Sequence, residues 1–138
     1  RAQYPQLAFR RVVMLSPPNQ GSEVVDTLGH WFLTKAMFRA ITGPAGEQLA
    51  TRADSVPNSL GAVDFELGVI AGNASLNPLY SLLIPGANDG TVAVERMRVE
   101  GMSDFITVRA SHTFIMYNAE AIRQVCCFLA HGCFDHTR

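Results

Sequence analysis

Charged residues are scarce in this sequence, and neither sign dominates. Only 17% of its 138 residues are charged, against about 25% in an average globular domain. With 11 Lys and Arg against 12 Asp and Glu, the net charge is −1. Such a balance provides no electrostatic footprint for nucleic acid or an anionic membrane surface, so we expect neither partner.

Cysteines and long apolar runs are also rare. The three cysteines, Cys126, Cys127 and Cys133, lie close together, which is not the spacing of a disulfide framework and leaves the cellular compartment open. No stretch approaches the roughly 18 consecutive apolar residues of a membrane helix, so we expect no transmembrane segment. The chain begins without methionine or a signal-peptide pattern, so we expect one domain, or part of one, cut from a longer protein.

Three short apolar runs predict β-strands, at 12–15, 67–71 and 105–108. The first is apolar at every position and rich in β-branched residues, which is typical of a strand covered on both faces in a parallel sheet. We therefore expect 12–15 to be a central strand with a neighbour on each side. Since these strands alternate with helical patterns, the sequence predicts an α/β architecture with a parallel sheet.

The clearest predicted helix spans 119–131. Asn118 suits the N-cap and Gly132 the C-terminal stop, following the known preferences of helix ends. The spacing predicts an apolar face made of four residues, Ile122, Val125, Cys126 and Leu129.

Polar side chains that could carry chemistry follow the predicted strands, in segments 16–22, 86–91 and 110–114. Open parallel sheets gather their functional groups at the carboxyl ends of strands. Asp89 and His112 lie in two of these segments, in an order that suits an acid orienting a general-base imidazole. The alternative interpretation is that Asn88-Asp89-Gly90 forms an ordinary turn and His112 is a polar loop residue.

Four segments resemble those of lipase-type serine α/β-hydrolases. Residues 12–22, Val-Val-Met-Leu-Ser-Pro-Pro-Asn-Gln-Gly-Ser, are similar to the strand and loop that follow the nucleophile helix in that family. Residues 85–92, Pro-Gly-Ala-Asn-Asp-Gly-Thr-Val, resemble its acid loop, and Ser111-His112-Thr113-Phe114 resembles its histidine loop. Residues 128–134 are similar to the last helix of small bacterial lipases and esterases.

The resemblance implies that residues 1–138 form the carboxyl-terminal part of an α/β-hydrolase fold, with parallel strands and flanking helices. It makes Asp89 and His112 two members of a Ser-His-Asp triad for carboxylic ester hydrolysis, on lipid or acyl esters. The Gly-x-Ser-x-Gly elbow of the family is absent, and the serines of 55–61 and 75–81 lack its flanking glycines. We therefore expect the nucleophile and oxyanion hole on a missing amino-terminal half, and the isolated chain to be inactive.

The segment 23–62 falls where this family places a helical cap over the active site. Its apolar residues between 28 and 41 cover more than one helical face, as in a cap lining an acyl pocket. An ordinary core helix is an equally good interpretation.

Two kinds of partner chain would complete such a half-domain: an amino-terminal fragment of the same protein, or a second copy of this chain. The competing interpretation of the function is a non-catalytic α/β half-domain that associates with another chain and hydrolyses nothing.

No cofactor is expected. Cysteines and histidines gather at 126–136, but their spacing matches no paired zinc-ligand pattern, so we expect no metal site. We interpret this window as buried thiols followed by a frayed tail.

Overall fold

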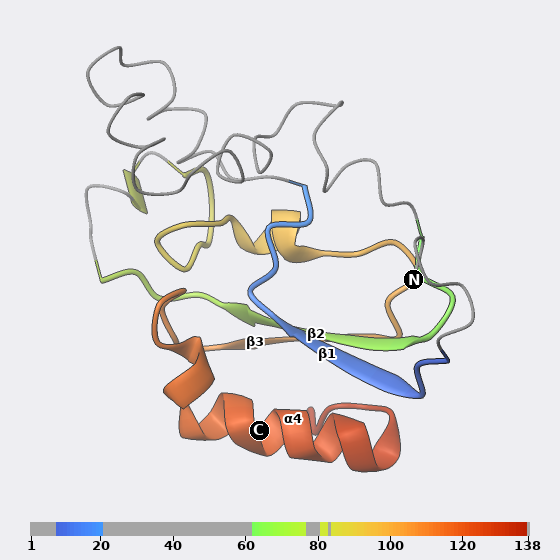
Figure 1. Ribbon diagram of the computed structural model, residues 1–138. Helices are drawn as coiled ribbons and strands as arrows, with labels where there is room; N and C mark the ends of the chain where they lie inside the picture. The colour runs from blue at the N-terminus through green and yellow to red at the C-terminus, as the bar shows by residue number, and fades with distance from the viewer. Residues whose placement is uncertain (1–7, 21–61, 77–80, 83, 138) are drawn as a thin grey trace, which may run out of the picture.

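The computed structural model describes residues 8–20, 62–76, 81–82 and 84–137 (Figure 1). Three parallel strands form its sheet, in the order β1 (Arg11–Leu15), β2 (Glu66–Gly72) and β3 (Asp104–Val108). Each strand contains one of the three predicted apolar runs, so the predicted parallel sheet is confirmed. Residues 23–61 of the predicted cap insert lie outside the described residues.

The central strand of this sheet is β2 and not β1. Strand β2 pairs with β1 on one side and β3 on the other, and Leu67, Val69, Ile70 and Ala71 are completely buried. Every residue of β1 is only half-buried, because the described residues give it a single neighbouring strand. Within the described residues, 12–15 therefore has one of its two expected neighbours, and its central position in a larger sheet stays a prediction.

Each face of the sheet has its own covering layer. Helix α4 (Ala119–His131) covers one face, while the segment with the short 3-10 helix η2 (Val94–Met97) covers the other (Figure 1). Alternation along β2 sends Ile70 toward the α4 layer and Leu67, Val69 and Ala71 toward the η2 layer, as the two-residue period of a strand requires. A second 3-10 helix, η3 (Ile115–Tyr117), connects β3 to α4.

Helix α4 has the predicted bounds and caps. The Asn118 side chain accepts a hydrogen bond from the Ala121 N–H, and Gly132 adopts a left-handed conformation with φ 82°. Its buried face was predicted only in part. Val125 packs against the core, but Cys126, Ile122 and Leu129 are exposed. The buried residues of the helix are Ala121, Gln124 and Phe128. Hydrophobic spacing alone missed this face because it includes a buried glutamine.

Helix α4 packs closely against the sheet at Gly68 of β2. A Cβ atom at Gly68 would lie only 2.7 Å from ring atoms of both Phe128 and Phe134. These two rings pack against each other with centroids 5.0 Å apart, and both are buried. The missing side chain of Gly68 therefore makes the space in which the aromatic pair packs on the sheet.

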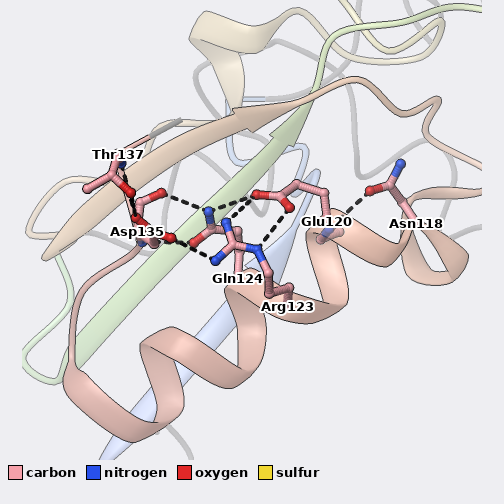
Figure 2. A network of polar contacts seen from close by, with 7 residues as sticks. Asn118, Glu120, Arg123, Gln124, Asp135 and Thr137 are labelled. Carbon is pink, nitrogen blue, oxygen red and sulfur yellow. Dashed lines mark hydrogen bonds and ion pairs between the residues drawn. The ribbon is translucent and has the colours of Figure 1, made fainter.

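The tail after α4 is held by polar contacts and is not frayed. Gln124 donates from Nε2 to the Asp135 carbonyl and accepts the Asp135 N–H at Oε1, each at 2.9 Å. Arg123 bridges Glu120 and Asp135, and Thr137 donates to the Asp135 carboxylate (Figure 2). Because of the hydrogen bonds from Thr137 and Arg123, the pKa of Asp135 falls to about 2.

The cysteines likewise differ from the expectation of buried thiols. Cys126 and Cys133 are exposed, and Cys127 is partly buried. In the described part of the chain, no helix has the length and apolar character needed to cross a membrane.

The close packing at Gly68 predicts that Gly68→Ala destabilises the fold. Overpacking of this kind typically costs about 1–3 kcal/mol, which urea denaturation measures directly. Adding Phe134→Leu, which removes part of the opposing ring, is expected to recover part of this loss. Equal denaturation midpoints for Gly68→Ala and the unchanged protein would contradict the packing described above.

Candidate active site

Asp89 and His112 are in direct contact near the carboxyl end of the sheet. The His112 Nδ1 atom lies 2.8 Å from Asp89 Oδ2, and the His112 backbone N–H donates to the Asp89 carbonyl at 3.0 Å. His112 follows β3, while Asp89 belongs to the 84–92 segment, which returns toward the end of β2. The fold therefore brings the two predicted site residues together, while their catalytic role stays a prediction.

The Asp89 carboxylate is buried and held from two sides. Its side chain is 0% exposed, whereas residues 85–87 of the same segment are exposed. While Oδ2 faces His112, Oδ1 accepts hydrogen bonds from the backbone N–H groups of Thr91 at 3.0 Å and Val92 at 2.8 Å. These contacts fix the carboxylate and replace the water lost on burial.

The imidazole of His112 is partly accessible, with 34% of its side chain exposed. An ionised carboxylate can only accept hydrogen bonds, so contact with Asp89 favours the tautomer in which Nδ1 carries the proton. No described residue forms a hydrogen bond with Nε2 of His112. Such an arrangement leaves a basic nitrogen that could take a proton from a hydroxyl group placed beside it.

A second glycine of β2 allows three chain segments to converge at this site. A Cβ atom at Gly72 would lie 2.6 Å from the Ala110 carbonyl oxygen, 3.0 Å from Asp89 Cβ and 3.3 Å from Ser16 Oγ. The Gly72 N–H donates to Ser16 Oγ at 3.1 Å. The close approach of the loops after β1 and β3 to Asp89 thus depends on the absence of a side chain at position 72.

Ser16 lies in this cluster but lacks the features of a nucleophile. It has φ 45°, a conformation uncommon for residues other than glycine, and its side chain is almost fully buried. Its Oγ atom accepts the Gly72 N–H, so the hydroxyl is part of the framework that joins the ends of β1 and β2.

A second carboxylate–histidine contact lies at the opposite end of the sheet, where β3 begins. Asp104, the first residue of β3, accepts hydrogen bonds from His136 Nε2 and from the Phe134 N–H. Burial opposes ionisation of Asp104, but the hydrogen bonds from Phe134, His136 and Phe105 outweigh it and lower the pKa of this carboxyl below its ordinary value. Because this pair fixes the tail at the amino end of a strand, we assign it a structural role.

Within residues 8–20, 62–76, 81–82 and 84–137, no three His, Cys, Asp or Glu side chains are grouped so that they could hold a metal ion. From the sequence, Asn88 was noted only as part of the Asn88-Asp89-Gly90 turn, and Gly72 was not noted as a site residue. The signal for Asn88 was its position directly before Asp89, in the dipeptide that begins the turn.

No protein-family model and no curated protein sequence matches this chain. Two similar solved structures are crystal structures of the Bacillus licheniformis lipase BlEst2. The propeptide form has a TM-score of 0.64 and 21% identity over 91% of this chain and 30% of its own. The mature form has a TM-score of 0.62 and 18% identity over 89% of this chain and 54% of its own. At these identities the likeness concerns the fold, and the chain spans about half or less of each neighbour.

The lowered pKa of Asp104 predicts how the tail responds to acid. The folded-state pKa lies below the ordinary carboxyl value, so the contact stabilises the tail above pH about 4 and is lost as pH falls through the lower folded pKa. NMR of the Phe134 amide proton should therefore show an upfield transition with a midpoint below about 3.9.

Asp104→Asn should lack this transition, whereas Glu95→Gln, which alters only an exposed ion pair with Arg98, should keep it. A midpoint at or above the ordinary carboxyl value in the unchanged protein would contradict the prediction.

Proposed function

We propose that this chain supplies the acid, Asp89, and the general base, His112, of a Ser-His-Asp triad that hydrolyses carboxylic esters. In this proposal the chain is the carboxyl-terminal part of an α/β-hydrolase domain. The serine nucleophile and the oxyanion hole belong to an amino-terminal segment outside this sequence. The observation that carries the proposal is the 2.8 Å contact between His112 Nδ1 and a fully buried carboxylate.

The surroundings of the pair support a catalytic role over a purely structural one. Asp89 is anchored by backbone N–H groups and directs one nitrogen of His112, while the ring remains one-third exposed. The pair lies near the carboxyl end of a parallel sheet, where such folds gather functional groups. The fold similarity to a lipase adds support, since the order acid before histidine is also that of α/β-hydrolases.

The proposed chemistry follows from this geometry. Nε2 of His112 takes the proton of the serine hydroxyl as the oxygen attacks the ester carbonyl, and later gives that proton to the leaving alcohol. Asp89 stays ionised throughout, holds the reactive tautomer and stabilises the imidazolium that forms. Water then attacks the acyl-enzyme with His112 again acting as base, which releases the carboxylic acid and restores the serine.

The residues that follow His112 favour a substrate with an apolar acyl group. Three large apolar side chains follow the histidine within five positions and are exposed, Phe114, Met116 and Tyr117. Exposed apolar side chains gathered in this way often mark a binding surface. The cap proposed for 23–62 would add to this surface.

Two uncovered surfaces support association with another polypeptide. Strand β1 is half-buried along its whole length and pairs with one strand among the described residues, and an edge strand is a template for further strand pairing. On α4, Ile122 and Leu129 remain 50% and 48% exposed. We propose an amino-terminal segment of the same protein as the partner, because it would also bring the nucleophile. A second copy of the chain would instead favour the non-catalytic half-domain.

Activity of a longer protein that contains this chain tests the triad. His112→Ala should abolish ester hydrolysis, while Asp89→Asn should lower kcat by roughly 10⁴-fold, because the acid mainly orients the base. A serine-directed fluorophosphonate should label the longer protein but not residues 1–138 alone.

Asp104→Asn and His136→Ala are the matched controls, since they break a similar contact at the amino end of β3, away from the candidate site. Both are expected to keep kcat near its original value. Full activity in His112→Ala would exclude the proposed base, and labelling of residues 1–138 would reveal a nucleophile within this chain.

Size-exclusion chromatography with light scattering tests association. The chain is expected to elute with an amino-terminal segment of the same protein, and Leu129→Glu should weaken that complex by placing a charge on the exposed face of α4. Leu82→Glu, at another exposed leucine, is the control and should leave the complex intact. A stable, folded monomer of residues 1–138 with no second polypeptide would refute the proposed association.

A further inference from the structure

Asn88 is a buried amide directly before Asp89, and the chemistry proposed above does not use it. Its residue is only 6% exposed, yet both polar atoms of its side chain are satisfied. Oδ1 accepts from Ser81 Oγ at 2.9 Å and from the Gly90 N–H at 3.1 Å. Nδ2 lies 3.0, 3.3 and 3.4 Å from the carbonyl oxygens of Gly86, Ser81 and Ile84.

The contact with Gly90 shapes the chain on the carboxyl side of Asp89. A side-chain oxygen that accepts the N–H two residues later closes an Asx turn, and Gly90 adopts φ 91° within it. This turn directs the next two N–H groups, those of Thr91 and Val92, back to Asp89 Oδ1. The anchoring of the carboxylate therefore depends on the bend that Asn88 closes.

The contacts of Nδ2 hold the chain on the amino side of Asp89. Three carbonyl oxygens from 81–86 converge on this one nitrogen, an arrangement that requires a hydrogen-bond donor. Asn88 thus ties the incoming segment and the outgoing turn to one side chain, with Asp89 between them. Such a buried and fully satisfied amide fixes a single loop conformation.

We propose that Asn88 is a positioning residue for the Asp89–His112 pair. It acts through the conformation of 84–92: by holding both ends of this segment, it sets where the Asp89 carboxylate lies and thereby which nitrogen of His112 is protonated. The inference rests on the proposed function for its importance to catalysis, but its physical claim concerns the pair alone. It can therefore be tested without substrate.

Nitrogen-15 NMR of the histidines in the full chain measures this effect. At pH 8, where an ordinary imidazole is neutral, the unchanged protein should show His112 as the Nδ1–H tautomer, with a downfield proton protected from exchange. In Asn88→Ala this resonance should be lost and the other tautomer should gain population. The His112 signals are assigned by their absence from His112→Ala.

Gln124→Ala is the matched control, because Gln124 is also a buried amide that anchors a loop by hydrogen bonds at both of its polar atoms. Its loop is the tail after α4, shown in Figure 2. The control should lose stability in urea and keep the Nδ1–H resonance of His112. Loss of the resonance in Gln124→Ala as well would show that it reports general destabilisation, which would overturn the proposal.

A milder variant keeps the test decisive if Asn88→Ala does not fold. Ser81→Ala removes only the hydroxyl donor to Asn88 Oδ1 and should weaken the Nδ1–H resonance without abolishing it. An unchanged resonance in a folded Asn88→Ala, or in Ser81→Ala where Asn88→Ala does not fold, would overturn the positioning role. A missing resonance in the unchanged protein would instead remove the Asp89–His112 pair, and the proposed triad with it.

Discussion

Two glycines on one face of the central strand allow the helix and the loops of the candidate site to pack directly against the sheet. Gly68 and Gly72 are four residues apart on β2, so they share a face of the sheet. A side chain at position 68 would displace the rings that join α4 and the tail to the sheet, and one at position 72 would collide with the loops that meet at Asp89. Helix α4 and the candidate site are therefore both positioned by close packing against the same face of β2.

Buried amides are the second device that the fold uses repeatedly. Asn88 fixes the segment that carries Asp89, and Gln124 fixes the tail after α4. In both cases one buried side chain forms hydrogen bonds with several backbone groups of an irregular segment. These hydrogen bonds give the irregular segments defined conformations without strand pairing. The difference lies in what they hold: one carries the candidate acid, and the other closes the core.

The two carboxylate–histidine contacts show how position in the fold separates similar chemistry. Asp104 and His136 meet at the amino end of β3, where they pin the tail. Asp89 and His112 meet near the carboxyl end of the sheet, with a buried carboxylate and a partly exposed ring. The two carboxylates also differ in burial, because the Asp89 side chain is completely buried and the Asp104 side chain is 18% exposed.

The sequence by itself determined the three strands, the bounds and caps of α4, and Asp89 and His112 as the residues to examine, because these depend on local hydrophobic period, turn chemistry and capping. It missed most of the buried face of α4, since burial of Gln124 depends on contacts between residues far apart in the chain. The roles of Gly68, Gly72 and Asn88 were decided only by the tertiary structure. A glycine matters for packing, and a buried amide for positioning, only through neighbours that folding brings to them from other parts of the chain.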